Sequence, residues 1–171
     1  MMTPTPPATA LGTAPPLHAA AVPAAEGLSW LLEEFTGRVT GVTGAMLVSR
    51  DGLKMAVSGL DTDGADRAAA WTSSLHSLAR SAATLVGARD DGFRQAIIED
   101  SSVLVFVMTA DHAAAAGAGA EPGLVGSVLG VLAEPQADPG VVGYEMSRLV
   151  KSVAEHLTTA TRDGRHIDGG R

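Results

Sequence analysis

The sequence predicts a single α+β domain in which helices flank a five-stranded antiparallel sheet. Two pairs of short apolar runs are each joined by a tight connection, which is typical of β-hairpins. A long Ala-rich helical pattern separates the two pairs, and an amphipathic helical pattern lies at each end. With one further strand after the second pair, the order is α-β-β-α-β-β-β-α, and hairpins combined with separate helices are typical of the α+β class.

The first helix is predicted from residue 27. Its apolar residues recur at the spacing of one helix face, while Glu33, Glu34 and Arg38 lie on the other side. Gly41 can end the helix, because glycine tolerates the backbone conformation found just after a helix. The apolar positions are Leu28, Leu31, Leu32, Phe35 and Val39.

The first hairpin is predicted around Arg50, Asp51 and Gly52. An Asp-Gly pair between two apolar runs is the strongest short-range indication of a hairpin turn. We therefore expect Gly44–Ser49 and Leu53–Ser58 to pair as antiparallel strands.

The middle helix begins after the capping acids of residues 61–66, runs to about Leu85 and ends at Gly87. It presents two different faces. An apolar stripe is expected to pack on the sheet, with Trp71 in the core, and a small-residue face is expected to let another helix approach closely. The apolar stripe consists of Trp71, Leu75, Leu78, Ala82 and Leu85. The small-residue face consists of Ala65, Ala69, Thr72, His76, Ala79 and Ala83.

Three further strands and a last helix follow. Gly92–Asp100 and Ser102–Thr109 form the second predicted hairpin, and Gly126–Ala133 is the fifth strand. The strand at 102–109 is apolar on both faces, which predicts a central strand covered by helices above and below. Asp138 can cap a last helix with Pro139 in its first turn. The apolar stripe of that helix is Val142, Met146, Leu149, Val153 and Leu157.

Composition sets the domain limits and excludes several classes of function. We expect a disordered Ala/Pro-rich tail at residues 1–25, one domain at 26–160 and a disordered tail at 161–171. The net charge of −7 argues against nucleic-acid binding, and the absence of cysteine removes disulfide, thiolate and zinc-knuckle chemistry.

Residues 1–25 lack the basic start and unbroken apolar stretch of a signal peptide, and no window is apolar enough to span a bilayer. We expect a cytoplasmic protein without direct membrane insertion.

No arrangement of residues predicts catalysis. Walker A, His-Glu-x-x-His and Gly-x-Ser-x-Gly patterns are absent, and no two of the five histidines lie at metal-ligand spacing. His76 is the most interesting histidine, and for it we weigh general base, interface contact and plain solvent exposure. We expect no enzyme, no metal and no cofactor.

Trp30 lies off the apolar face of its helix, so we expect it to be partly exposed and, with Arg80, a candidate partner contact.

Four segments in this order resemble a bacterial Roadblock/LC7 domain, a profilin-like sandwich. The resemblance covers about residues 27–158. Within that family, the sequence is most similar to the small proteins encoded in bacterial operons with a sensor-kinase-like protein and a Ras-like GTPase. The segments are LSWLLEEFTGRVTGVTGAMLVSRDGLKMAVSG, LHSLAR within the middle helix, FRQAIIEDSSVLVFVMTA and GVVGYEMSRLVKSVAEHL.

The resemblance implies a sheet with the middle helix on one side and the terminal helices on the other. It also implies a homodimer joined through the third strands and the middle helices. A small Ras-like GTPase is the implied partner, and a membrane sensor-kinase-like protein is a further candidate that would bring the chain to the membrane. Carried onto this sequence, the dimer interface consists of Ala69, Thr72, His76, Ala79, Ala83, Phe93, Arg94, Gln95 and Ile97.

The leading functional hypothesis is therefore a non-catalytic homodimeric adaptor or regulator of a small Ras-like GTPase in bacterial signalling. The alternative is a small-molecule-sensing domain, because profilin-like and PAS-like sandwiches share this architecture and fold alone does not decide function. That alternative requires an enclosed pocket of a few hundred Å³, and a solid core around Val105, Phe106, Leu129 and Val131 would count against it. A third hypothesis is a small hydrolase that uses His76.

Overall fold

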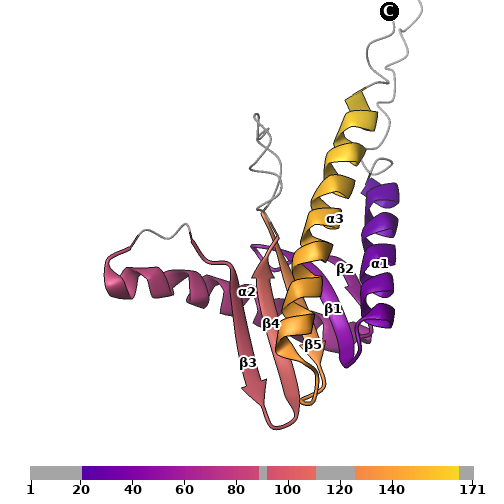
Figure 1. Cartoon of the computed structure of the whole chain (residues 1–171). Helices are drawn as coiled ribbons and strands as arrows, with labels where there is room; N and C mark the ends of the chain where they lie inside the picture. Colours follow the sequence, from indigo (N-terminus) through magenta and orange to yellow (C-terminus); the bar gives the residue numbers. More distant parts are fainter. Residues whose placement is uncertain (1–20, 89–91, 111–125, 166–171) are drawn as a thin grey trace, which may run out of the picture.

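The computed structural model describes residues 21–88, 92–110 and 126–165 (Figure 1). The observed order of helices and strands confirms the predicted one, with a short 3-10 helix added after the middle helix. The elements are α1 (Ala21–Arg38), β1 (Val42–Ser49), β2 (Lys54–Ser58), α2 (Thr62–Ser81), η1 (Ala82–Val86), β3 (Gln95–Asp100), β4 (Val103–Thr109), β5 (Ser127–Ala133) and α3 (Pro139–Arg165).

All five strands form one antiparallel sheet in the order β2-β1-β5-β4-β3. The last strand in the sequence lies at the centre, where it pairs with β1 on one side and β4 on the other. The strands β2 and β3 form the two edges of the sheet. The predicted five-stranded antiparallel sheet is therefore confirmed.

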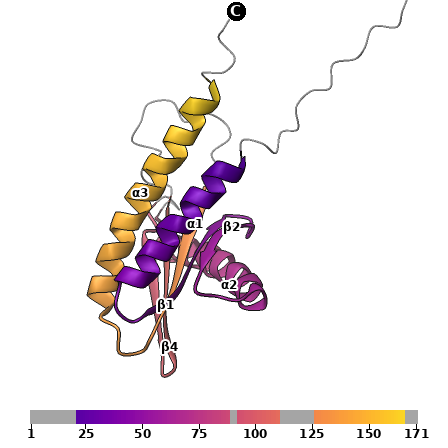
Figure 2. The same ribbon diagram turned by 90° about the vertical axis from the view of Figure 1, so that its right-hand side faces the viewer.

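Helices cover both faces of the sheet. Figures 1 and 2 show α1 and α3 side by side on one face and α2 crossing the other. The apolar stripes of α1 and α3 pack on the first face together with Phe106, and α2 packs on the second face over Val107. Both Phe106 and Val107 are 0% exposed, which confirms that β4 is buried on both of its faces.

Backbone angles and hydrogen bonds confirm the predicted hairpin turn and the predicted capping residues of α2 and α3. Gly52 has a φ of +88°, a conformation that glycine adopts without strain, and it closes the β1–β2 hairpin. Asp61 caps α2 by accepting a hydrogen bond from Gly64 N at 2.7 Å. Asp138 caps α3 by accepting hydrogen bonds from Gly140 N at 2.8 Å and Val141 N at 3.1 Å.

The two terminal helices are longer than the sequence predicts. Helix α1 begins at Ala21, before the expected domain start at residue 26, and α3 continues to Arg165, past the expected end at 160. The rest of the two predicted tails, residues 1–20 and 166–171, lies outside the described residues, as does the Ala/Gly segment at 113–123.

The two faces of α2 are oriented the opposite way from the prediction. The small residues Ala65 and Ala69 are 3% exposed and pack on the sheet, whereas Trp71 is 42% exposed. The prediction that Trp71 is a core residue is therefore wrong. The physical reason is close packing, because a Cβ at Gly130 of β5 would lie only 2.7 Å from Thr72 Oγ1. Only small side chains fit between a helix and a sheet at that separation.

Candidate interaction surface

The C-terminal part of α2 extends beyond the sheet. Figure 1 shows α2 and η1 projecting past β3, with no other described element beneath them. The side chains of Leu78, Leu85 and Val86 are 69%, 86% and 82% exposed. Large apolar side chains gathered at a projecting end are a typical feature of protein interaction sites. We call η1, residues Ala82–Val86, the tip of this projection.

The edge strand β3 adds a second feature beside this projection. It pairs with β4 on one side, and no described strand pairs with its other side. Because Thr109 N donates to Arg94 O, the alternation of antiparallel pairing turns the Ile97 N–H and C=O toward the open edge. The Ile97 side chain is itself 45% exposed. An edge of this kind can pair with another strand.

The structure separates the residues predicted for the dimer interface into two groups. Ala69, Thr72 and His76 are 3%, 2% and 2% exposed, because they pack against the sheet of their own chain. They cannot form an accessible interface in this fold, and this part of the prediction is corrected. The other predicted interface residues are partly or fully exposed and lie near the projection and the β3 edge. They are Ala79, Ala83, Phe93, Arg94, Gln95 and Ile97.

His76 links α2 to β4 and to the segment that precedes β3. Its Nε2 lies 3.2 Å from the hydroxyl of Thr109 in β4, and that hydroxyl donates to the carbonyl oxygen of Phe93 at 3.2 Å. Because a hydroxyl has one proton to donate, Nε2 is the donor in its own bond to Thr109. The His76 ring also meets the Phe93 ring edge to face at 5.3 Å. At 2% exposure, His76 is a structural residue with no surface that a substrate could reach.

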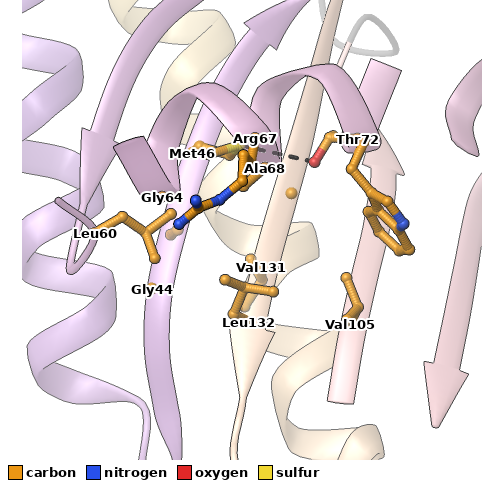
Figure 3. A pocket seen from close by; sticks show the side chains of 13 residues that line it. Gly44, Met46, Leu60, Gly64, Arg67, Ala68, Thr72, Val105, Val131 and Leu132 are labelled. Carbon is orange, nitrogen blue, oxygen red and sulfur yellow. Dashed lines mark hydrogen bonds between the residues drawn. The ribbon is translucent and has the colours of Figure 1, made fainter. Parts of the chain in front are cut away.

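A cavity of about 270 Å³ lies between the first half of α2 and the sheet (Figure 3). Val105 and Leu132 form part of its floor, Leu60 lies at its side, and the Arg67 side chain extends along α2. Trp71 also lines the cavity. The cavity is open to solvent and mostly apolar. The sheet below it is solid, since the side chains of Phe106, Leu129 and Val131 are at most 1% exposed.

The opposite layer carries a further feature, a groove of about 460 Å³ between α1 and α3. Arg38 lines the groove and pairs with Glu145 at 2.9 Å. On the same two helices Trp30 and Tyr144 are 60% and 65% exposed, which confirms the expected exposure of Trp30. Arg80 lies on α2, across the sheet, so the two candidate partner contacts do not form one patch.

The described part of the chain contains neither a cluster of metal ligands nor a helix that could span a membrane. Within residues 21–88, 92–110 and 126–165, no three His, Asp or Glu side chains come close enough to hold a metal ion. None of the helices in those ranges combines the length and apolar content needed to cross a bilayer.

At the β3–β4 turn, the Ser102 N–H donates to Asp100 at 2.8 Å and lowers the pKa of that carboxyl below its usual value of 3.8.

Comparisons with known proteins agree with this architecture. A crystal structure of a Roadblock/LC7 domain from Streptomyces avermitilis is 42% identical, with 76% of this chain and 97% of that chain covered at a TM-score of 0.63. A second Streptomyces Roadblock/LC7 domain is 34% identical, with 73% and 96% covered at a TM-score of 0.53. MglB from Myxococcus xanthus is 13% identical, with 80% and 91% covered at a TM-score of 0.61, which shows a shared fold.

The search of curated proteins gives no match. The sequence model of the Roadblock/LC7 domain matches residues 28–118, which is more than half of the chain. This match and the two Streptomyces structures establish the relationship independently of each other. The chain belongs to the Roadblock/LC7 domain family.

Proposed function

We propose that this chain is a non-catalytic, homodimeric regulator of a small Ras-like GTPase in a bacterial signalling complex. Membership of the Roadblock/LC7 family supports the proposal, because such domains are protein interaction modules. The observation that carries it is the open β3 edge lying beside an exposed apolar projection. A catalytic role has no support in the described residues, where the most suggestive side chain, His76, is buried.

The dimer in this proposal differs from the one expected from sequence. The β3 strands of two copies pair edge to edge, and the exposed apolar stripe of α2 faces the second copy. Ala79, Ala83 and Ile97 belong to this interface, whereas Ala69, Thr72 and His76 support it from within each chain. A symmetric pair of this kind covers both the strand edge and the apolar side chains, which a monomer leaves in water.

Replacing Ile97 with proline tests the edge pairing. Proline lacks the N–H that points to the open edge, and it leaves the hydrogen bonds between β3 and β4 in place. We expect Ile97→Pro to be monomeric by light scattering and to keep its circular dichroism spectrum. Ile97→Thr retains the N–H and is the matched control, so it should remain dimeric. A wild-type monomer at high concentration would exclude the dimer.

The GTPase partner is tested by binding. The wild-type dimer is expected to capture a Ras-like GTPase encoded beside it, loaded with either GTP or GDP, in a pull-down. The exposed Trp30 on the α1–α3 layer is a candidate contact, and in this proposal the partners recruit the chain to the membrane. Absence of binding in both nucleotide states would exclude this function.

A second candidate function is the sensing of a small molecule, but the cavity under α2 is open to solvent and the sheet below it is solid, and both observations count against the enclosed pocket that a sensor requires. The cavity volume of about 270 Å³ is just below the range of about 300–1,000 Å³ that is typical of ligand pockets. A ligand in this position would contact Trp71, so its binding should change tryptophan fluorescence. Saturable binding of a cytoplasmic metabolite to the intact dimer would support this candidate over the first.

A further inference from the structure

The charged side chains that line the groove between α1 and α3 are mostly basic, although the whole chain has a formal net charge of −7. Among the described residues that line the groove, Arg38, Arg148 and Lys151 are basic and Glu34 is acidic. We propose that this groove binds an acidic amphipathic helix of a partner protein. The inference goes beyond the proposed function, because the groove lies across the sheet from α2 and binding there requires neither the β3 dimer nor a bound nucleotide.

A single carboxylate holds two of the basic side chains beside the groove. One oxygen of Glu145 lies 2.9 Å from Arg38 Nη1, and the other lies 3.4 Å from Arg148 Nη1. The Glu145 side chain is 17% exposed, so this network joins α1 to α3 in a partly buried position. One carboxylate balances the charge of one guanidinium, and each guanidinium has several N–H donors. A second carboxylate can therefore bind to the pair without displacing Glu145.

Lys151 extends the positive surface beyond this network. It lies one helical turn after Arg148, and no ion pair engages it in the part of the chain that the structure describes. Lys151 also lines a second hollow of about 520 Å³ between α3 and the β3–β4 hairpin, where Arg94 adds a further basic side chain. The basic side chains outnumber Glu34 and Glu145, so this surface is positive in a chain that is negative as a whole.

The shape of the groove fits a helix. Its two walls, α1 and α3, lie side by side and run in opposite directions (Figure 2). The lining residues fall within 31–38 of α1 and 144–152 of α3, so at a rise of about 1.5 Å per residue each wall is about 10–12 Å long. Phe35 and Leu149 form an apolar floor, and Tyr144 beside it is 65% exposed. A helix with apolar side chains toward this floor and acidic side chains at its flanks would match both features.

Other occupants of the groove lack this complementarity of charge. Residues 1–20 contain no Asp or Glu, and residues 166–171 contain one Asp and one Arg, so neither terminal segment of this chain matches the groove. A second copy that docked through the same groove would bring like charges together. A nucleic acid or an anionic membrane would be repelled by the net charge of the whole chain. A protein segment with local negative charge fits best.

Fluorescence anisotropy with the full chain tests this inference. The probe is a fluorescein-labelled synthetic helix of about 15 residues, with leucine on one face and glutamate on both flanks. We expect saturable binding to the wild type that weakens as salt is added. Arg148→Gln with Lys151→Gln, both at exposed positions, should weaken binding on the order of tenfold. Lys54→Gln with Arg67→Gln is the matched control, because it removes the same charge from β2 and α2 and should leave binding unchanged.

The outcomes distinguish the proposed occupant from the others. Absence of saturable binding, an equal loss in both double variants, or equal binding of a probe with glutamine in place of glutamate would overturn the inference. It would also be wrong if the variant at positions 148 and 151 lost self-association in light scattering, or lost binding to phosphatidylserine vesicles, while the control variant kept it. Circular dichroism checks that both variants are folded. The dimer and GTPase tests are separate measurements, so their failure would leave this inference standing, and its failure would leave the proposed function standing.

Discussion

Replacing Gly130 with alanine tests which face of α2 packs on the sheet. The new Cβ would lie 2.7 Å from Thr72 Oγ1 and 3.0 Å from Thr72 Cγ2, and Thr72 is 2% exposed. Because neither side can yield into solvent, the helix or the strand must shift, and overpacking of this kind costs about 1–3 kcal/mol. At fixed protein concentration, we expect the urea midpoint followed by circular dichroism to fall by roughly 0.5–1.5 M.

Two further variants make this measurement decisive. Thr72→Ala removes both crowding atoms, so the double variant should recover part of the loss, with a coupling energy of about 1 kcal/mol or more. Gly37→Ala is the control, since a Cβ there meets nothing within 4 Å and alanine is the better helix former. If Gly130→Ala is as stable as the wild type and shows no coupling to position 72, the close packing of α2 described here is wrong.

The remaining predictions concern single side chains. His76→Ala should lower the free energy of unfolding by about 2–4 kcal/mol in urea titrations, through the lost bond and ring contact. Asp138→Ala removes the α3 cap and should cost about 1 kcal/mol in the same assay. Trp30→Ala should change stability by less than about 0.5 kcal/mol but weaken binding of the proposed GTPase partner in calorimetry. Asp100 should titrate below 3.8 by NMR, so its bond to Ser102 stabilises the fold at higher pH and is lost as pH falls through that lowered pKa.

Most of the fold could be predicted because its signals are local. The Asp51-Gly52 turn, the caps at Asp61 and Asp138 and the two-sided apolar pattern of β4 each depend on residues close together in the sequence. Local patterns also identify which strands form hairpins. They do not determine the order of strands in the sheet, and the central place of β5 was not predicted from the residues.

The faces of α2 could not be predicted because the decisive information lies on other elements. Hydrophobicity favours burial of Trp71 and Leu78, yet the distance between helix and sheet is set by Gly130 and by the bond from His76 to Thr109. Gly130 and Thr109 are each more than thirty residues away in the sequence from Thr72 and His76, the α2 residues that they contact. An apolar stripe can equally be an external surface that contacts another protein, and the pattern of one helix does not distinguish the two.

The central place of β5 also has a consequence for biosynthesis. The hairpins β1–β2 and β3–β4 are not hydrogen-bonded to each other, and β5 alone joins them. During translation, both hairpins therefore emerge with unpaired apolar strands and must wait until residue 133 has left the ribosome. Contacts between elements far apart in the sequence slow folding. The nascent chain is thus most vulnerable to aggregation just before its fifth strand appears, which is when chaperone binding would protect it.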